Sequence, residues 1–235
     1  MTGRLAGIGV GPGDPELLTL KAVRRLAEAD VVVTLAAADR PSRARAIAAA
    51  HLPPHARELH VPLAMGPDRG RVEAAYDRLA AAVREELAAG ATVAVLCEGD
   101  PLLFGTFVHL LHRLPADAAV DVVPGIPSAL AAAAVERWPI TVGAEGFAVL
   151  PATMGAAALH AALAQVRSAA LLKIGKRVGE IRALLAGLDL LADARLVVEL
   201  GGAGERRLPL ADWAEDAAPY FSLILTRGLG ARDGG

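Results

Sequence analysis

Short runs of apolar, often β-branched residues alternate along the chain with longer segments in which Ala, Leu and Arg recur at helical spacing. The short runs predict strands and the longer segments predict helices. Strands are expected at residues 5–10, 31–35, 93–97, 120–123, 147–150, 170–174, 196–200 and 220–226, and helices at residues 42–50, 71–89, 104–113, 127–137, 156–166 and 178–187. This alternation predicts an α/β fold with largely parallel strands.

The segment after the first expected strand carries the clearest helix start. Asp14 suits an N-cap, Pro15 suits the first helical position, and Glu16 complements the positive end of the helix dipole. The buried stripe of this helix is expected to comprise Leu17, Leu20, Val23 and Ala27.

Residues 114–117 are the best candidate for a linker between two α/β halves, because Pro115 interrupts the periodic pattern. We therefore expect an N-terminal α/β domain at residues 1–116 and a C-terminal α/β domain at residues 117–235. A chain of 235 residues with 54% hydrophobic content is long enough to bury a core in each half.

Composition excludes several classes of protein. A formal net charge of −2 argues against a general nucleic-acid-coating protein. Cys97 is the single cysteine, so an intrachain disulfide framework and a cysteine-based zinc cluster are excluded, and its apolar strand predicts a core residue rather than a nucleophile. No signal-peptide pattern opens the chain, and apolar runs such as residues 129–135 are too short to span a bilayer. We expect a soluble cytoplasmic protein.

The histidines invite a metal hypothesis that their spacing does not support. Pro53 and Pro54 interrupt the first group, and the second group offers two ligands on one helix face. Surface or capping roles are the better interpretation of all five histidines, and no metal site is predicted. The first group is His51, His55 and His60, and the second is His109 and His112.

Four loops rich in Gly and Pro follow expected strands, at residues 9–14, 98–101, 123–128 and 150–153. The first loop is not a Rossmann fingerprint, because Asp14 stands where the third glycine is needed, and the chain has no P-loop motif. A single such loop could be a plain tight turn. Four of them indicate a ligand crevice, since ligands in open parallel sheets bind outside the carboxyl ends of the strands. Asp100 and Ser128 could each contact that ligand or cap the following helix.

These loops carry a resemblance to a known family. Residues 10–22 (VGPGDPELLTLKA), residues 98–101 (EGDP) and residues 124–126 (PGI) with Ser128 resemble, in order and spacing, the signatures of the tetrapyrrole methylases, and the likeness extends from residue 5 to residue 226. Residues 96–101, 149–153 and 219–222 most resemble the precorrin-2 C-20-methyltransferase branch. The chain departs from the family pattern at Leu35, where relatives often have Tyr, and at the glycine-rich residues 201–204. These departures bear on the expected contacts with the tetrapyrrole more than on those with the cofactor.

The resemblance implies two α/β domains with a cofactor cleft between them, a homodimer, and transfer of a methyl group from S-adenosyl-L-methionine to C-20 of precorrin-2, giving precorrin-3A in cobalamin (vitamin B12) and porphyrin-related biosynthesis. By the same resemblance, the methionine and ribose portions of the cofactor should contact Pro12, Gly99, Asp100, Pro101, Leu102, Leu103, Thr106 and Phe107. The adenine should contact Leu150, Pro151, Ala152, Lys173, Tyr220, Phe221 and Ser222.

The chemistry requires two further groups of residues that the sequence leaves open. The proton at C-20 must leave, and Glu98, Asp100 and Glu199 are candidate bases by position, with no choice among them. The substrate carboxylates require cations, for which arginine is best suited. Plausible cations, each of which could equally lie on a solvated surface, are Arg40, Arg43, Arg45, Lys176 and Arg177.

Other functions remain open at this point. The same fold and cofactor could act on cobalt-factor II, another tetrapyrrole, a diphthine precursor or ribosomal RNA, although no basic and aromatic surface pattern supports the RNA version. A non-catalytic sensor that binds S-adenosylmethionine is a further alternative, and a purely structural protein leaves the four loops unexplained. Neither a nucleic acid nor a membrane is expected as a partner.

Overall fold

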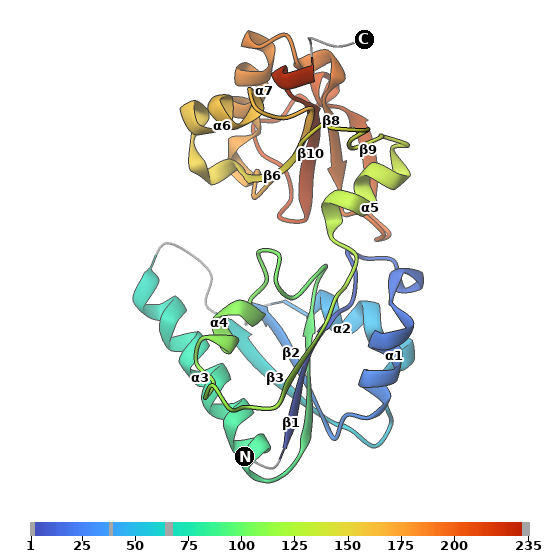
Figure 1. The fold of residues 1–235 in the computed structure, drawn as a ribbon, viewed down its shortest axis with the longest axis vertical. Helices are drawn as coiled ribbons and strands as arrows, with labels where there is room; N and C mark the ends of the chain where they lie inside the picture. The colour runs from blue at the N-terminus through green and yellow to red at the C-terminus, as the bar shows by residue number, and fades with distance from the viewer. Residues whose placement is uncertain (1–2, 38–39, 64–67, 232–235) are drawn as a thin grey trace. The chain divides into compact units, whose positions relative to one another are not determined.

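The structure is a computed structural model that describes residues 3–37, 40–63 and 68–231 (Figure 1). It divides into two compact units, Met1–Pro127 and Ser128–Gly235, each containing a five-stranded sheet flanked by helices. Residues 114–117 form a turn inside the first unit instead of a linker, because the strand that follows them pairs within the first sheet. The chain therefore passes between units after Pro127, beyond the expected boundary at residue 116.

The first unit contains a parallel sheet in the order β3-β2-β4-β1-β5. Its strands are β1 (Arg4–Gly9), β2 (Val31–Ala37), β3 (Arg57–Leu63), β4 (Thr92–Cys97) and β5 (Val120–Val123). The expectation of parallel strands is confirmed here. Strand β3 was not expected, because Pro62 and the charged side chains of this segment give it the character of an edge strand, which is the position it occupies.

Helices cover both faces of this sheet (Figure 1). Helices α1 (Leu20–Ala27) and α2 (Arg43–Ala48) lie on one face, and α3 (Arg69–Ala88) and α4 (Phe107–Leu111) lie on the other. Successive strand residues point to opposite faces. Accordingly, Ile8 belongs to the core cluster beneath α1 and α2, whereas Leu5 belongs to the cluster beneath α3 and α4.

Helix α1 starts later than the sequence pattern predicts. Asp14 caps only a short 3₁₀ turn (Pro15–Leu17), after which Leu18 is extended and Thr19 caps the α-helix by accepting a hydrogen bond from the N–H of Ala22 at 3.1 Å. The new start changes which side chains face the sheet. The predicted stripe is wrong at Leu20, which is 85% exposed, and at Ala27, which is exposed, whereas Leu17 and Val23 are half-buried. The buried residues of α1 are Ala22 and Leu26.

The second unit contains a mixed sheet in the order β6-β7-β10-β8-β9. Its strands are β6 (Phe147–Pro151), β7 (Ser168–Leu172), β8 (Arg195–Val198), β9 (Arg206–Pro209) and β10 (Ser222–Arg227). Strands β6 and β7 run parallel, whereas β10 is antiparallel to β7 and β8, and β9 is antiparallel to β8. The expectation of parallel strands is therefore wrong for most of this sheet.

The helices of the second unit are α5 (Ser128–Val135), α6 (Ala156–Leu163) and α7 (Val178–Gly187). Its apolar core joins α6 and α7 to the sheet through residues such as Leu163, Ile181 and Ile224. None of the helices in the described ranges has the length and apolarity needed to cross a membrane.

Candidate functional site

Three of the sequence-predicted loops lie side by side in the first unit, because β1 lies between β4 and β5 and all three strands end at the same edge. We call residues 10–14 loop 1, residues 98–106 loop 2 and residues 124–127 loop 3. Loops 1 and 2 are joined by paired backbone hydrogen bonds, from the Gly11 N–H to the Gly99 carbonyl at 3.3 Å and from the Gly99 N–H to the Gly11 carbonyl at 2.8 Å.

The glycines allow these loops to pack backbone against backbone. A Cβ on Gly125 would lie 2.0 Å from the carbonyl oxygen of Gly99, and a Cβ on Gly9 would lie 2.5 Å from the Gly125 nitrogen. Gly11 and Gly99 also adopt φ values of +79° and +64°, which side-chain-bearing residues rarely adopt. The contact requires residues without a Cβ, and it brings main-chain polar groups together at the sheet edge.

Asp100 ties loop 2 to loop 3. Its Oδ1 accepts a hydrogen bond from the Leu102 N–H at 2.9 Å, and its Oδ2 accepts one from the Gly125 N–H at 3.1 Å. The carboxylate therefore stabilises the turn of its own loop and the neighbouring strand end, and it does not cap α4, whose N-cap residue is Thr106.

The remaining residues of loop 2 divide between surface and core. Leu102, Leu103 and Phe104 are 53%, 37% and 45% exposed. Pro101 is buried and Thr106 is half-buried. Phe107 is fully buried against β1, where a Cβ on Gly7 would meet its ring at 2.5 Å, so its side chain lies in the core and apart from the exposed part of the loop.

The first turn of α2 contacts the same group of loops. The guanidinium of Arg43 donates a hydrogen bond from Nη2 to the carbonyl oxygen of Pro12 at 3.0 Å. Burial raises the pKa of Glu98 above its ordinary value, while the charge of Arg43 and a hydrogen bond from the backbone of Ala44 act in the opposite direction. Arg43, which was expected to bind the tetrapyrrole, therefore contacts loop 1. Glu98, a candidate base, belongs to loop 2 and interacts with the first turn of α2.

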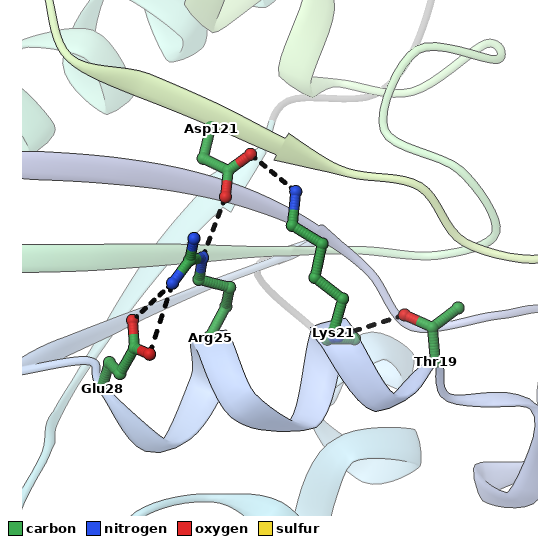
Figure 2. A network of polar contacts seen from close by, with 6 residues as sticks. Thr19, Lys21, Arg25, Glu28 and Asp121 are labelled. Atoms are coloured by element: carbon green, nitrogen blue, oxygen red, sulfur yellow. Dashed lines mark hydrogen bonds and ion pairs between the residues drawn. The ribbon is translucent and has the colours of Figure 1, made fainter.

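An ionic network holds α1 against β5 (Figure 2). Asp121 accepts hydrogen bonds from Lys21 Nζ and Arg25 Nε, each at 2.9 Å, and Arg25 also contacts Glu28 at 2.9 Å. The hydrogen bonds from Lys21 and Arg25 hold the pKa of Asp121 below its ordinary value. Because loop 1 leads into α1 and β5 leads into loop 3, this network fixes the supports of two loops.

The predicted adenine contacts come together at one edge of the sheet in the second unit. The carboxyl ends of β6 and β7 meet there, with Pro151 opposite Leu172, and antiparallel β10 begins at the same edge. The residues brought to this edge are Leu150, Pro151, Ala152, Lys173, Tyr220, Phe221 and Ser222. Lys173 adopts a φ of +55°, an uncommon backbone conformation for a residue with a side chain.

A buried hydroxyl lies at this edge beside two exposed aromatic rings. Ser222 is 7% exposed, and within the described residues its Oγ is a buried polar atom without a hydrogen-bond partner. Tyr220 and Phe221 are 62% and 37% exposed and pack edge to face with ring centres 5.0 Å apart. The Phe221 carbonyl accepts a hydrogen bond from the N–H of Glu199 at 2.7 Å, which places this candidate base at the same edge.

Several other candidates are engaged in local contacts. Arg45 pairs with Glu58 at 2.6 Å and Arg177 pairs with Glu180 at 3.0 Å, whereas Arg40 and Lys176 are exposed. The His60 ring nitrogen Nδ1 lies 3.1 Å from the hydroxyl of Thr34, and no group of three potential metal ligands occurs in the part of the chain that the structure describes. Of the remaining histidines, His109 stacks on Tyr76 at 4.1 Å.

Cys97 is 6% exposed, which confirms the prediction of a core residue. Burial, together with the carboxylates of Asp100 and Glu98, raises the pKa of its thiol far above the ordinary value. A thiol with this surrounding remains protonated and is a poor nucleophile.

Comparison with known proteins gives consistent matches over nearly the whole chain. The sequence profile of the family described as Tetrapyrrole (Corrin/Porphyrin) Methylases matches residues 4–212. The chain is 40% identical over 235 residues to a precorrin-2 C(20)-methyltransferase from a Sinorhizobium species, with 96% of each protein covered. It is 34% identical to a cobalt-precorrin-2 C(20)-methyltransferase from Salmonella typhimurium, again with 96% of each covered. A solved structure of uroporphyrin-III C-methyl transferase from Thermus thermophilus complexed with S-adenosyl homocysteine matches with a TM-score of 0.67 and 29% identity, covering 97% of this chain and 98% of that one.

Proposed function

The chain belongs to the tetrapyrrole (corrin/porphyrin) methylase family, and from this premise we propose that it transfers a methyl group from S-adenosyl-L-methionine to C-20 of precorrin-2, giving precorrin-3A in cobalamin biosynthesis. The observation that carries the proposal is the 40% identity to a precorrin-2 C(20)-methyltransferase over 96% of both proteins. The alignment covers 96% of the chain, so the likeness extends through both units.

The residues of the first unit fit a cofactor held mainly by main-chain groups. Gly9, Gly99 and Gly125 pack backbone against backbone without intervening side chains, which brings main-chain polar groups of the loops together at this edge. We assign the methionine and ribose portions to the edge formed by loops 1 and 2, where the exposed side chains of Leu102 and Leu103 supply apolar contact surface.

The residues of the second unit fit an aromatic, hydrogen-bonding group such as adenine. The Oγ of Ser222 needs a partner, and a buried hydroxyl without one is costly. The exposed rings of Tyr220 and Phe221 offer stacking surface beside it. We therefore assign the adenine to the edge that carries these three residues.

The chemistry needs orientation more than it needs a covalent enzyme nucleophile. S-adenosyl-L-methionine supplies a sulfonium methyl group that is open to in-line attack by the electron-rich C-20 carbon. The chain contributes by fixing the two reactants in line and by excluding water. Asp100 is already engaged by two backbone N–H groups, and Glu98 is engaged by the backbone of Ala44 and the charge of Arg43, which leaves Glu199 as the less committed candidate for accepting the C-20 proton.

The cellular setting is part of the proposal. A cytoplasmic location agrees with the single buried cysteine, Cys97, since reduced thiols are typical of that compartment. The homodimer rests on the family resemblance. The substrate is a small-molecule tetrapyrrole, and the 34% identity to a cobalt-precorrin-2 C(20)-methyltransferase makes the cobalt-bearing counterpart the second candidate acceptor.

The test is an anaerobic incubation of the purified protein with ¹³C-methyl-labelled S-adenosylmethionine and precorrin-2, with and without inserted cobalt. Mass spectrometry and carbon NMR should show one added methyl group at C-20, and the preferred acceptor decides between the two candidates. Tight cofactor binding without transfer to either acceptor would refute the C-20 assignment and favour a sensor.

A further inference from the structure

Arg43 lies where one side chain contacts loop 1 and is electrostatically coupled to loop 2. Its Nη2 donates to the Pro12 carbonyl at 3.0 Å, and its charge interacts with the carboxylate of Glu98, the first residue of loop 2. The Glu98 carboxylate also accepts a hydrogen bond from the backbone of Ala44, the next residue of α2. The first turn of α2 therefore engages the two loops that are joined to each other by the Gly11 and Gly99 backbone pair.

The Arg43 side chain restricts the backbone conformation of loop 1 by a hydrogen bond from another element, α2. The N–H of Gly11 is paired with Gly99, whereas Pro12 has no N–H and cannot take part in a backbone pair as a donor. Its carbonyl is held by a charged donor, and hydrogen bonds from charged donors are stronger than neutral ones. The charge of Arg43 also favours the ionised form of Glu98, a half-buried carboxylate whose pKa is raised by burial.

We propose that Arg43 acts as a positioning residue that holds loop 1 in the conformation that binds S-adenosylmethionine, with Glu98 as its electrostatic partner. This inference rests on the proposed function. It gives Arg43 a role in cofactor affinity in place of binding a substrate carboxylate, and it gives Glu98 a role through Arg43 in place of accepting the C-20 proton.

The experiment measures the dissociation constant of S-adenosylhomocysteine by calorimetry for the unaltered protein, Arg43→Gln, Arg43→Lys, Glu98→Gln and the double variant Arg43→Gln with Glu98→Gln. Loss of a charged hydrogen bond should raise the dissociation constant about 10-fold in Arg43→Gln. Arg43→Lys, which keeps the charge and one donor, should recover part of the affinity. The double variant should bind no more weakly than Arg43→Gln alone, because residues that act as a unit are not additive.

The matched control is Arg113→Gln. Arg113 likewise donates from its guanidinium to a backbone carbonyl, that of His109 at 3.0 Å, and has acidic partners in Glu73 and Asp77, but it lies outside the three loops. Its removal should leave the dissociation constant within about 2-fold of the unaltered value, which is the ordinary scatter of such effects. Thermal unfolding of each variant shows whether a change in affinity reflects loss of the fold.

Turnover separates positioning from catalysis. In Arg43→Gln the KM for S-adenosylmethionine should rise about 10-fold while kcat at saturating cofactor and the KM for precorrin-2 stay close to the unaltered values. Unchanged affinity in Arg43→Gln, or a loss of kcat in Glu98→Gln at saturating cofactor, overturns the inference and leaves the proposed function intact. Failure of the unaltered protein to bind S-adenosylhomocysteine refutes the proposed function and this inference together.

Discussion

Asp100 and Gly125 are 25 residues apart in sequence, yet the Oδ2 of Asp100 accepts a hydrogen bond from the N–H of Gly125 at 3.1 Å. The pair joins the loop after β4 to the loop after β5, with β1 lying between the two strands. The carboxylate thereby fixes the spacing across three strand ends, which is a structural role for a residue that the sequence motif places at the cofactor.

Replacing Asp100 tests how far cofactor binding depends on this tie. Asp100→Ala removes the acceptors of the Leu102 and Gly125 N–H groups, and we expect the free energy of unfolding to fall by about 2 kcal/mol and S-adenosylhomocysteine to bind at least about 10-fold more weakly. Asp100→Asn keeps one acceptor oxygen and should lie between the two. Urea unfolding and calorimetry measure both effects. Full affinity in Asp100→Ala would show that the loops hold their spacing without the carboxylate.

Gly125 should tolerate no side chain. A Cβ there would lie 2.0 Å from the Gly99 carbonyl and 2.8 Å from the backbone of Gly9, and backbone atoms on both sides cannot rotate away. We expect Gly125→Ala to cost about 3 kcal/mol or more, at the upper end of overpacking effects, and to abolish cofactor binding.

The control for this change is Gly70→Ala on α3 in the same unit. The added Cβ would meet only the Asp68 side chain at 3.4 Å, an ordinary contact, and the substitution favours the helix. We expect a gain of about 0.5 kcal/mol from the reduced freedom of the unfolded chain. Equal stability of the two variants in thermal unfolding would contradict the packing argument.

The sequence predicts the three loops of the first unit well, and the reason is physical. Strands β1 and β4 are apolar because they lie inside the sheet and are buried on both faces, and the edge strand β5 is visible as a short valine-rich run, so the ends of these strands and the glycines that follow can be seen in the pattern. β3 lies at the edge of the sheet and is less apolar, so the sequence pattern does not reveal it as a strand.

Other features depend on tertiary pairing and could not be predicted in this way. The antiparallel direction of β10 is set by its neighbours β7 and β8 and leaves no mark in its own apolar pattern. The contact of Arg43 with Pro12 joins residues whose spacing carries no signal. The late start of α1, in contrast, could have been predicted from the sequence. Thr19 is as suitable an N-cap as Asp14, and the extended backbone of Leu18 separates the short turn that Asp14 caps from the helix that Thr19 caps.

The network of Asp121 should make stability depend on pH and salt (Figure 2). Its pKa is lowered by Lys21 and Arg25, so the stabilisation is present above the ordinary pKa of Asp, about 3.9, and is lost as the pH falls through the lower pKa of the folded state. The side chain is 37% exposed, and solvent screening limits the expected loss in Asp121→Asn to about 1 kcal/mol at pH 7. Denaturant unfolding across pH and salt measures it.

The difference between Asp121→Asn and the unaltered protein should shrink in high salt, and it should also shrink as the pH falls below the ordinary pKa of aspartate and through the lower pKa of the folded state. Glu28→Gln serves as the control, because Glu28 is 54% exposed and contacts Arg25 alone within the network. Its loss should be smaller. A difference that persists in strong acid would mean that Asp121 stabilises the fold through something other than its charge.

Cys97 should react with alkylating reagents only when the protein unfolds. The side chain is 6% exposed, and burial and nearby carboxylates keep the thiol protonated, so the reactive thiolate is scarce in the folded state. With iodoacetamide at pH 8.5 we expect labelling at a rate that follows the fraction unfolded in urea, and slower labelling with S-adenosylhomocysteine present. Rapid labelling of the native protein, at a rate independent of urea, would disprove this account.

Ser222 should affect the free and the cofactor-bound protein in opposite directions. Its buried Oγ lacks a partner, so Ser222→Ala removes a desolvated hydroxyl and should raise the free energy of unfolding of the free protein by about 1 kcal/mol. The same change removes the hydrogen bond that we propose between Ser222 and the adenine. It should weaken the binding of S-adenosylhomocysteine about 5-fold, so the ligand raises Tm less than in the unaltered protein. Ser168→Ala is the matched control, because Ser168 is equally buried in the same sheet but donates to the Ile140 carbonyl. Its loss should destabilise the free protein and leave affinity unchanged. If Ser222→Ala instead destabilises the free protein and binds the ligand normally, Oγ serves the fold and the adenine is held elsewhere.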